Sequence, residues 1–222
     1  MSDLINDANY VVERFYSEIL KENPESYDTQ HPNRYKATLR HLLSYDIKEQ
    51  VVCDMGCGSG YFLKMIDQSN RLIGIDGAII EKDELERYKY NFDYDRFGEM
   101  SGITDVDHML CFETFEHLSN PYNFIFECKK MMKEGALFHI SYPDQDIQHN
   151  TFYPSLLWHT SNFIQFMEQM AFMNKKQFRI KTRFGHVHFF VFENRPWSEI
   201  KMKWPKKGPQ FEGAPPHIQV NI

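Results

Sequence analysis

An apolar strand that ends in a glycine-rich loop is the feature that most constrains this chain. Residues 51–55 are apolar apart from Asp54, and glycines then stand at positions 56, 58 and 60. Glycine at such a turn lets the backbone approach a ligand closely, because no Cβ stands in the way. The sequence therefore predicts a strand, loop and helix that hold a ligand at the end of the strand.

The glycine spacing restricts the kind of ligand. A dinucleotide fingerprint needs G-x-G-x-x-G, whereas here the third glycine comes one residue early and Tyr61 stands in the required place. Asp54 would repel a phosphate and attract a cation. No lysine follows the loop as in a P-loop, and Ser59 lacks the G-x-S-x-G order of a nucleophile elbow. We therefore expect a positively charged ligand rather than a nucleoside triphosphate or a hydrolase substrate.

Four ordered segments resemble the class I S-adenosylmethionine-dependent methyltransferases. Residues 54–60 are similar to motif I of that family, and residues 71–76 resemble its second strand, which ends in an acid. Residues 109–118, with Pro121 after them, resemble the strand-four segment of the small-molecule branch. Residues 131–143 resemble the helix-to-strand passage that follows. Four matches at βαβ spacing are much more specific than one glycine loop.

The resemblance implies a cofactor and its binding residues. S-adenosylmethionine would be the methyl donor and S-adenosylhomocysteine the product. In the family, the acid that ends the second strand holds the ribose hydroxyls, which gives this role to Asp76, and an acid of the third strand lies at the adenine edge, which gives this role to Asp93. The expected cofactor-binding residues are Asp54, Gly56, Cys57, Gly58, Gly60, Asp76, Gly77, Asp93, Phe112 and Glu113.

Hydrophobic periodicity and capping residues predict the order of elements. The expected helices are residues 4–21, a helix capped by Asn33, residues 61–67, residues 81–90, a helix from Pro121 to a stop at Gly135, and residues 161–170. The first expected strand begins near Gln50. Further strands are expected at 71–76, 90–94, 107–113 and 137–142, followed by a hairpin whose strands are 176–183 and 186–193. The connection at residues 143–160 is long enough to serve as a substrate-binding loop.

These elements predict a single-domain α/β protein with a Rossmann-like three-layer α/β/α sandwich. Its sheet should have seven strands, mostly parallel, with strand seven antiparallel as in the family. A chain of 222 residues, 42% of them hydrophobic, can bury one substantial core. We expect N-terminal helices at 1–46 that cap the domain and active site, a cofactor-binding core at 47–196, and an extended tail with prolines and lysines at 197–222.

Methyl transfer to a hydroxyl needs alignment and a base. Alignment can supply about 7 to 11 kcal/mol, and a general base adds roughly 10² to 10⁴ in rate. His159, just before the helix that should border the substrate pocket, is the first choice as base. His117 follows strand four at the edge where ligands bind in open α/β folds, which makes it the second candidate. Its alternative role, which the family resemblance implies, is to stabilise the conformation of the loop after strand four by packing.

The acceptor is less well constrained. Enzymes that methylate the exocyclic amine of a base carry an Asn/Asp-Pro-Pro-aromatic tetrapeptide after strand four, whereas residues 111–114 read Cys-Phe-Glu-Thr. The leading interpretation is methyl transfer to a small molecule, at oxygen. The alternatives are an RNA or protein methyltransferase that uses the basic tail around Trp204, and a non-catalytic cofactor-binding subunit. The oligomeric state stays open.

Composition gives the remaining expectations. The net charge of −6 disfavours a nucleic-acid partner. The chain shows no secretory signal and no apolar run of membrane-spanning length, so we expect no membrane partner. Four cysteines without a C-x-x-C pair predict reduced thiols and a cytoplasmic location. We also expect no metal, since His186 and His188 lack an acidic or cysteine partner at ligand spacing.

Overall fold

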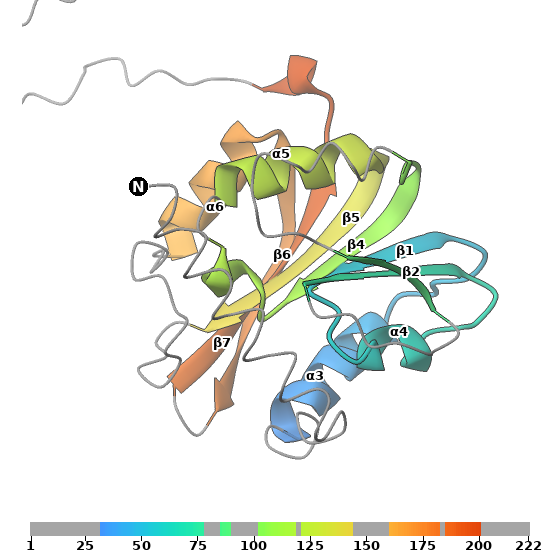
Figure 1. Ribbon diagram of the computed structural model, residues 1–222. Coiled ribbons are helices and arrows are strands. Elements are labelled where there is room, and N and C mark those ends of the chain that lie inside the picture. The colour runs from blue at the N-terminus through green and yellow to red at the C-terminus, as the bar shows by residue number, and fades with distance from the viewer. Residues whose placement is uncertain are drawn as a thin grey trace, which may run out of the picture.

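Helices cover both faces of a seven-stranded sheet in the computed structural model (Figure 1), which describes residues 32–77, 85–89, 102–118, 121–143, 160–182 and 185–200. The helices are α3 (Pro32–Leu42), α4 (Tyr61–Met65), α5 (Pro121–Met131) and α6 (Thr160–Gln169), with short 3₁₀ turns η2 (Phe115–His117) and η4 (Trp197–Glu199). The strands are β1 (Val51–Met55), β2 (Arg71–Asp76), β3 (Glu86–Lys89), β4 (Val106–Phe112), β5 (Met132–Pro143), β6 (Phe172–Thr182) and β7 (Gly185–Asn194).

The strand order is β3-β2-β1-β4-β5-β7-β6. Strands β1 to β5 pair in parallel, and β7 runs antiparallel to both β5 and β6. This confirms the predicted α/β fold with an antiparallel strand seven. The parallel register brings the carboxyl ends of β1, β2, β4 and β5 to one edge of the sheet, where such folds bind their ligands.

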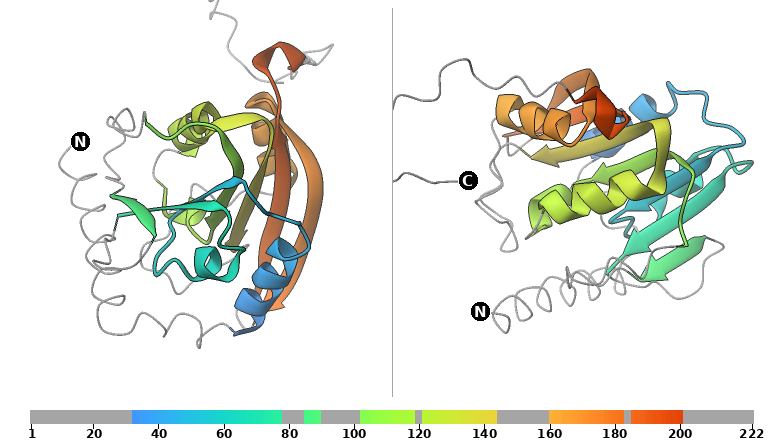
Figure 2. Two further views of the ribbon diagram at one scale, coloured as in Figure 1. Left: turned by 90° about the vertical axis from the view of Figure 1, so that its right-hand side faces the viewer. Right: turned by 90° about the horizontal axis from the view of Figure 1, so that it is seen from above.

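Two apolar clusters fill the layers on either side of the sheet. One lies under α5 and α6, and its centre is Phe163, whose ring centroid is 5.2 Å from Phe115, 5.0 Å from Tyr142 and 5.0 Å from Phe190. The other joins α3 and α4 to the opposite face. Figure 2 shows the same separation of the two helix pairs. The apolar side chains of α6 thus belong to the core, because the full burial of each large apolar side chain stabilises the fold by roughly 1.5 to 3 kcal/mol.

The sequence prediction was wrong around β3. Residues 86–89 were expected in a solvent-facing helix, yet they form a strand that pairs with β2 from Ile73 to Asp76. A charged residue such as Glu86 suits an edge strand, because charge opposes further strand pairing. Arg71 on β2 binds Glu86 across the strands at 2.9 and 2.7 Å. This long-range pairing overrides a helical pattern.

The junction of α5 and β5 also differs from the prediction. The helix was expected to continue to Gly135, but it ends at Met131 and β5 begins at once. Met132 pairs with Val106, and the register then shifts before Leu137 pairs with His108. Gly135 lies in this irregular stretch with a φ of +80°. The predicted helix at 4–21, the strand at 90–94 and most of the tail lie outside the described residues.

Candidate functional site

The glycine loop between β1 and α4 takes a conformation that only glycine readily adopts. Gly56, Gly58 and Gly60 have φ values of +81°, +49° and +74°. A Cβ on Gly56 would lie 2.0 Å from Thr114 Oγ1, and a Cβ on Gly60 would lie 2.4 Å from Leu85 Cδ1. All three glycines therefore suit the backbone conformation, and Gly56 and Gly60 also allow the close approach of neighbouring elements.

Hydrogen bonds tie this loop to the end of β2. The backbone N–H groups of Gly56 and Cys57 donate to the carbonyl of Ile75 at 2.7 and 3.1 Å. The N–H of Gly58 donates to Asp76 Oδ2 at 2.7 Å. Asp76 thus fixes the loop that precedes α4, and the binding of ribose hydroxyls that the family resemblance implies for it stays a prediction.

Asp54 brings a buried carboxyl group to the same edge. Asp54 is 2% exposed, and this burial raises the pKa of Asp54 to about 7. The charge of Asp76 also raises this pKa, and the charge of Arg87 lowers it. A cation beside these two carboxylates would offset both the burial and their mutual repulsion. The acids and the glycine cradle therefore fit a ligand that carries positive charge, as the sulfonium and ammonium groups of S-adenosylmethionine do.

A second polar group surrounds Glu113, directly after β4. Glu113 has a φ of +53°, which for a residue other than glycine costs about 1 to 3 kcal/mol and is most common at functional sites. Arg34 of α3 donates to Glu113 Oε2 at 3.0 Å, and Ser141 of β5 donates to Oε1 at 2.8 Å. The carboxylate thus joins three elements beside the glycine loop. Its predicted contact with the cofactor stays a prediction.

The two candidate bases differ in what the structure says of them. His117 lies in η2, is 6% exposed, and its Nε2 is 3.8 Å from Glu116 Oε1. His159 lies outside the described residues, as does Asp93 among the cofactor residues. Thr160, which begins α6, has its Oγ1 3.4 Å from His188 Nδ1. The catalytic roles of both histidines stay predictions.

Aromatic rings join α3 to the exit of the glycine loop. Tyr35 stacks on Phe62 with ring centroids 5.3 Å apart and meets Tyr61 edge-on at 5.2 Å. Phe62 in turn contacts Phe112, a predicted cofactor residue, at 5.2 Å. These contacts hold α3 over the start of α4. Gly77, the last predicted cofactor residue of this edge, follows β2 directly.

Sequence reasoning did not single out Arg34, Ser141 or Arg87. Arg87 of β3 donates to the carbonyls of Gly58 and Ser59. One signal could have indicated Arg34: a basic residue in the first turn of a helix opposes the helix dipole and suggests a carboxylate partner. Ser141 and Arg87 carry no comparable local signal.

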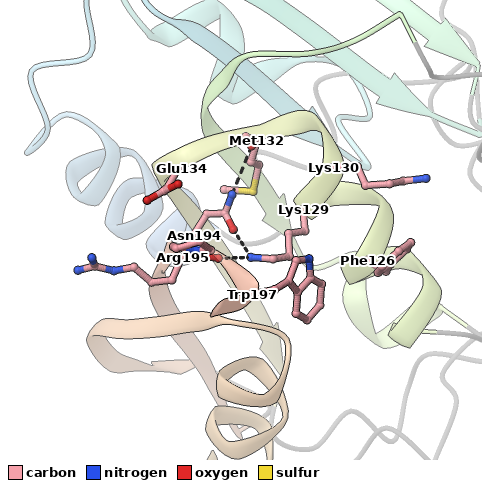
Figure 3. Close-up of a pocket in the computed structure, with 9 residues that line it drawn as sticks. Phe126, Lys129, Lys130, Met132, Glu134, Asn194, Arg195 and Trp197 are labelled. Carbon is pink, nitrogen blue, oxygen red and sulfur yellow. Dashed lines mark hydrogen bonds between the residues drawn. The ribbon is translucent and has the colours of Figure 1, made fainter. Parts of the chain in front are cut away.

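Within the described ranges, no three His, Cys, Asp or Glu side chains gather as metal ligands. No helix there is long and apolar enough to cross a membrane. A pocket of about 260 Å³ lies between α5, the start of β5 and η4 (Figure 3). Because β5 runs parallel to β4 and β4 to β1, its start lies at the amino edge of these strands, opposite the glycine loop.

Comparisons with known proteins agree with this geometry. A sequence model described as a methyltransferase domain matches residues 27–195. Ubiquinone biosynthesis O-methyltransferase of Glaesserella parasuis serovar 5 (strain SH0165) is 31% identical over 103 residues, which cover 40% of this chain and 44% of that protein. A probable S-adenosylmethionine-dependent methyltransferase of Mycolicibacterium smegmatis is 30% identical over 99 residues, which cover 42% and 38%. The chain thus spans less than half the length of these curated relatives.

Solved structures show the same fold at low identity. The Burkholderia thailandensis 1,6-didemethyltoxoflavin-N1-methyltransferase has a TM-score of 0.64 at 14% identity, over 86% of this chain and 90% of that one. Magnesium protoporphyrin IX methyltransferase of Synechocystis PCC 6803 has a TM-score of 0.64 at 10% identity, over 84% and 97%. The family match spans most of the chain, and the fold and the glycine loop agree with it. The chain therefore belongs to the methyltransferase-domain family, and its fold is that of the class I S-adenosylmethionine-dependent methyltransferases.

Proposed function

We propose that this enzyme transfers a methyl group to an oxygen atom of a small-molecule acceptor, with a histidine as general base. The observation that carries the donor half is the cradle of Asp54, Asp76 and the three glycines at the carboxyl edge of the sheet. When bound, the cofactor supplies a methyl group that its sulfonium already activates. The two acids attract that positive charge, and the loop lets the backbone approach it closely.

The acceptor half rests on relatives and on the end of β4. The relative at 31% identity is named as an O-methyltransferase of ubiquinone biosynthesis, and the two structural neighbours are named for small acceptors. Enzymes that methylate the exocyclic amine of a base have a polar residue and two prolines after strand four. This chain has Cys-Phe-Glu-Thr at residues 111–114, and Arg34 and Ser141 bind Glu113 of this segment. A small hydroxylated acceptor bound beside Glu113 agrees with both observations.

His159 is the base that we favour, with His117 as the second candidate. His159 directly precedes α6, whose buried face packs on the end of β5. His117 is 6% exposed and lies against Glu116, which favours a packing role. His159→Ala should lower turnover and leave the affinity for S-adenosylmethionine unchanged, whereas His117→Ala should chiefly lower stability. Full activity of His159→Ala would dismiss it as base.

A dependence on a partner protein is the second candidate. A neighbour with a TM-score of 0.63 at 15% identity is a putative methyltransferase in complex with the Haloferax volcanii Trm112 methyltransferase activator; the match covers 82% of this chain and 98% of that one. By analogy, this chain would need a partner for activity, or would serve as the cofactor-binding subunit. An RNA or protein acceptor that contacts the tail at 197–222 is the further alternative.

The test begins with the cofactor and then separates the acceptors. Calorimetry with S-adenosylmethionine and S-adenosylhomocysteine should show binding of both. Labelled methyl groups should then enter a small-molecule extract but not RNA or protein. The small-molecule proposal would be overturned if the labelled methyl group entered only RNA or protein and if deletion of residues 201–222 abolished this transfer. Cofactor binding without transfer to any extract, followed by transfer when a cell lysate supplies a protein partner, would favour the subunit role.

The domain layout and location follow as parts of the same proposal. We infer that residues 1–46 cap the active site, because Arg34 and Tyr35 of α3 already contact the glycine loop region and Glu113. The core would then occupy residues 47–196. All four cysteines are free and buried, which supports a reducing, cytoplasmic location.

A further inference from the structure

Arg87 reaches from β3 to the glycine loop and binds its backbone. Its Nη1 donates to the carbonyl of Gly58 at 3.0 Å and its Nη2 donates to the carbonyl of Ser59 at 3.1 Å. Nη1 also lies 3.3 Å from Cys57 Sγ. The planar guanidinium thus contacts three successive residues of the loop, a geometry that the point charge of lysine cannot reproduce.

Two nearby glycines leave room for the groups that make this contact, Gly60 for Arg87 and Gly74 for Cys57. Arg87 pairs in register with Gly74 of β2, where a Cβ would come within 2.9 Å of Cys57 Sγ. At Gly60, a Cβ would lie 2.9 Å from Arg87 Nη2. The sequence therefore keeps two positions without side chains around the contact between Arg87 and the loop.

The charge of Arg87 also acts on Asp54, the buried acid of the site. The titratable groups that interact electrostatically with Asp54 are Asp76 of β2, Arg87 of β3 and the thiols of Cys53, Cys57 and Cys111. Burial raises the pKa of each of these thiols, so they stay neutral at ordinary pH. Arg87 is the group that lowers the pKa of Asp54, against burial and Asp76, which raise it.

We propose that Arg87 is a positioning residue for cofactor binding: it holds the carbonyls of Gly58 and Ser59 in place, and its positive charge balances Asp54 and Asp76. The loop N–H that binds Asp76 belongs to Gly58, and Arg87 binds the carbonyl of the same residue, so the two contacts together fix the peptide groups on either side of the Gly58 Cα. The inference depends on cofactor binding and not on the acceptor, so it stands or falls separately from the proposed acceptor and base.

Two variants of Arg87 separate its geometry from its charge. Arg87→Met removes both, whereas Arg87→Lys keeps the positive charge but loses the planar guanidinium that binds two carbonyls at once. The matched control is Arg71→Met on β2, where the arginine binds Glu86 at the exposed edge and does not bind the glycine loop. The measurements are calorimetric Kd values for S-adenosylmethionine and S-adenosylhomocysteine from pH 6 to 8.5, and the thermal unfolding of each ligand-free variant.

Arg87→Met should weaken the binding of both cofactor forms by about tenfold or more, since hydrogen bonds from a charged donor are lost. It should also move the pH dependence of S-adenosylmethionine binding upward, because Asp54 then keeps its proton to higher pH. Arg87→Lys should lose part of the affinity but retain the wild-type pH midpoint. Arg71→Met should bind both ligands like the wild type.

Two results would overturn the proposal. One is a Kd for both ligands within about twofold of the wild type together with an unmoved pH midpoint, a difference too small to reflect lost hydrogen bonds. The other is a loss of affinity that Arg71→Met shares, or that disappears when the assay is run well below the melting temperature of the variant. Either would reduce Arg87 to a general contributor to the stability of this edge.

Discussion

At the scale of single residues, three glycines differ in what an added methyl group would meet. Gly56 combines a φ of +81° with a Cβ position 2.0 Å from Thr114 Oγ1. Gly135 has a φ of +80° but open space around its Cβ position. Gly102 has open space as well, and its φ lies outside the left-handed range. The three positions separate backbone strain from steric overlap.

Alanine at these glycines should therefore give graded effects. Gly102→Ala should leave stability nearly unchanged, and Gly135→Ala should cost about 1 to 2 kcal/mol for the left-handed backbone. Gly56→Ala should cost a further 1 to 3 kcal/mol or so from overpacking and should also weaken S-adenosylmethionine binding. Urea unfolding and calorimetry measure both quantities. Equal stability of the Gly56 and Gly135 variants would show that Thr114 yields without cost.

Asp76 should contribute to cofactor binding in two ways, through its charge and through its bond to the Gly58 N–H. Asp76→Ala removes both and should weaken S-adenosylmethionine binding by about 1.5 to 3 kcal/mol. Asp76→Asn keeps an oxygen that can accept the Gly58 N–H but loses the charge. It should therefore weaken the cationic S-adenosylmethionine more than the neutral thioether S-adenosylhomocysteine, and calorimetric titrations give that ratio. An unchanged ratio would argue against an electrostatic role.

Local pattern explains which site residues the sequence could predict. The glycines, Asp54 and Asp76 stand in or next to short motifs, and the structure brings them to one edge. Arg34 is 79 residues from Glu113, and Ser141 is 28 residues from it. Contacts of this length depend on how α3 and β5 pack on the sheet, which no local pattern records. His159 and Asp93 stay predictions.

At the scale of elements, Lys129 joins the end of α5 to two other parts of the fold (Figure 3). Its ammonium donates to Asn194 Oδ1 at the end of β7 and to the carbonyl of Arg195, as the dashed lines of Figure 3 show, and also to the carbonyl of Ala171 before β6. It also lies 4.7 Å from the ring centroid of Phe172 and 4.9 Å from that of Trp197. The residue is 7% exposed, and burial lowers the pKa of Lys129 to about 8.

Removal of this ammonium should therefore loosen the junction. Lys129→Met should lower the free energy of unfolding by about 1 to 3 kcal/mol, because three acceptors lose their donor. Lys130→Met is the matched control, since Lys130 is half-exposed and pairs with Glu127 on the helix surface. The control should change stability by less than about 0.5 kcal/mol. Urea unfolding measures both values, provided that the m values of the variants equal that of the wild type. Equal stabilities of the two variants would contradict the proposed role of Lys129 at this junction.

The elements that the sequence placed well have strong hydrophobic periods. The strand at 71–76 agrees with β2 in both bounds, and the hairpin at 176–193 agrees with β6 and β7 apart from their longer ends. The error at β3 has the opposite cause. Glu86, Arg87 and Lys89 show no apolar alternation, and the strand exists because β2 offers an edge to pair with. Tertiary pairing of this kind overrides local preference.

At the scale of the whole molecule, three buried histidines connect one helix to two strands. His139 of β5 lies between the others: its Nδ1 is 3.1 Å from His41 Nε2 of α3, and its Nε2 is 3.0 Å from His108 Nδ1 of β4. In the neutral state, His139 donates to one neighbour and accepts from the other. Burial lowers the pKa of His41 and of His108 to about 4, and it lowers the pKa of His139 as well.

This arrangement should make stability depend on pH. The unfolded chain takes up protons near pH 6.5, whereas the folded histidines stay neutral to about pH 4, so the unfolded state binds more protons in that window. The free energy of unfolding should therefore be largest above pH 6.5 and fall as the pH is lowered toward 4. Between pH 6 and 5, each such histidine should contribute a loss of about 1 kcal/mol.

A variant that removes one titrating ring tests this cause. His41→Phe keeps a ring against Tyr45 and Phe178, and its stability should fall by about 1 kcal/mol less than that of the wild type between pH 6 and 5. Phe178→Leu is the control, because it removes a ring beside His41 without removing a titrating group. Its stability should be lower at every pH, with a curve parallel to that of the wild type. Urea unfolding at several pH values measures these slopes. If the free energy of unfolding of His41→Phe ran parallel to that of the wild type between pH 6 and 5, the acid sensitivity would belong to other groups, because a change in packing alone lowers stability equally at every pH.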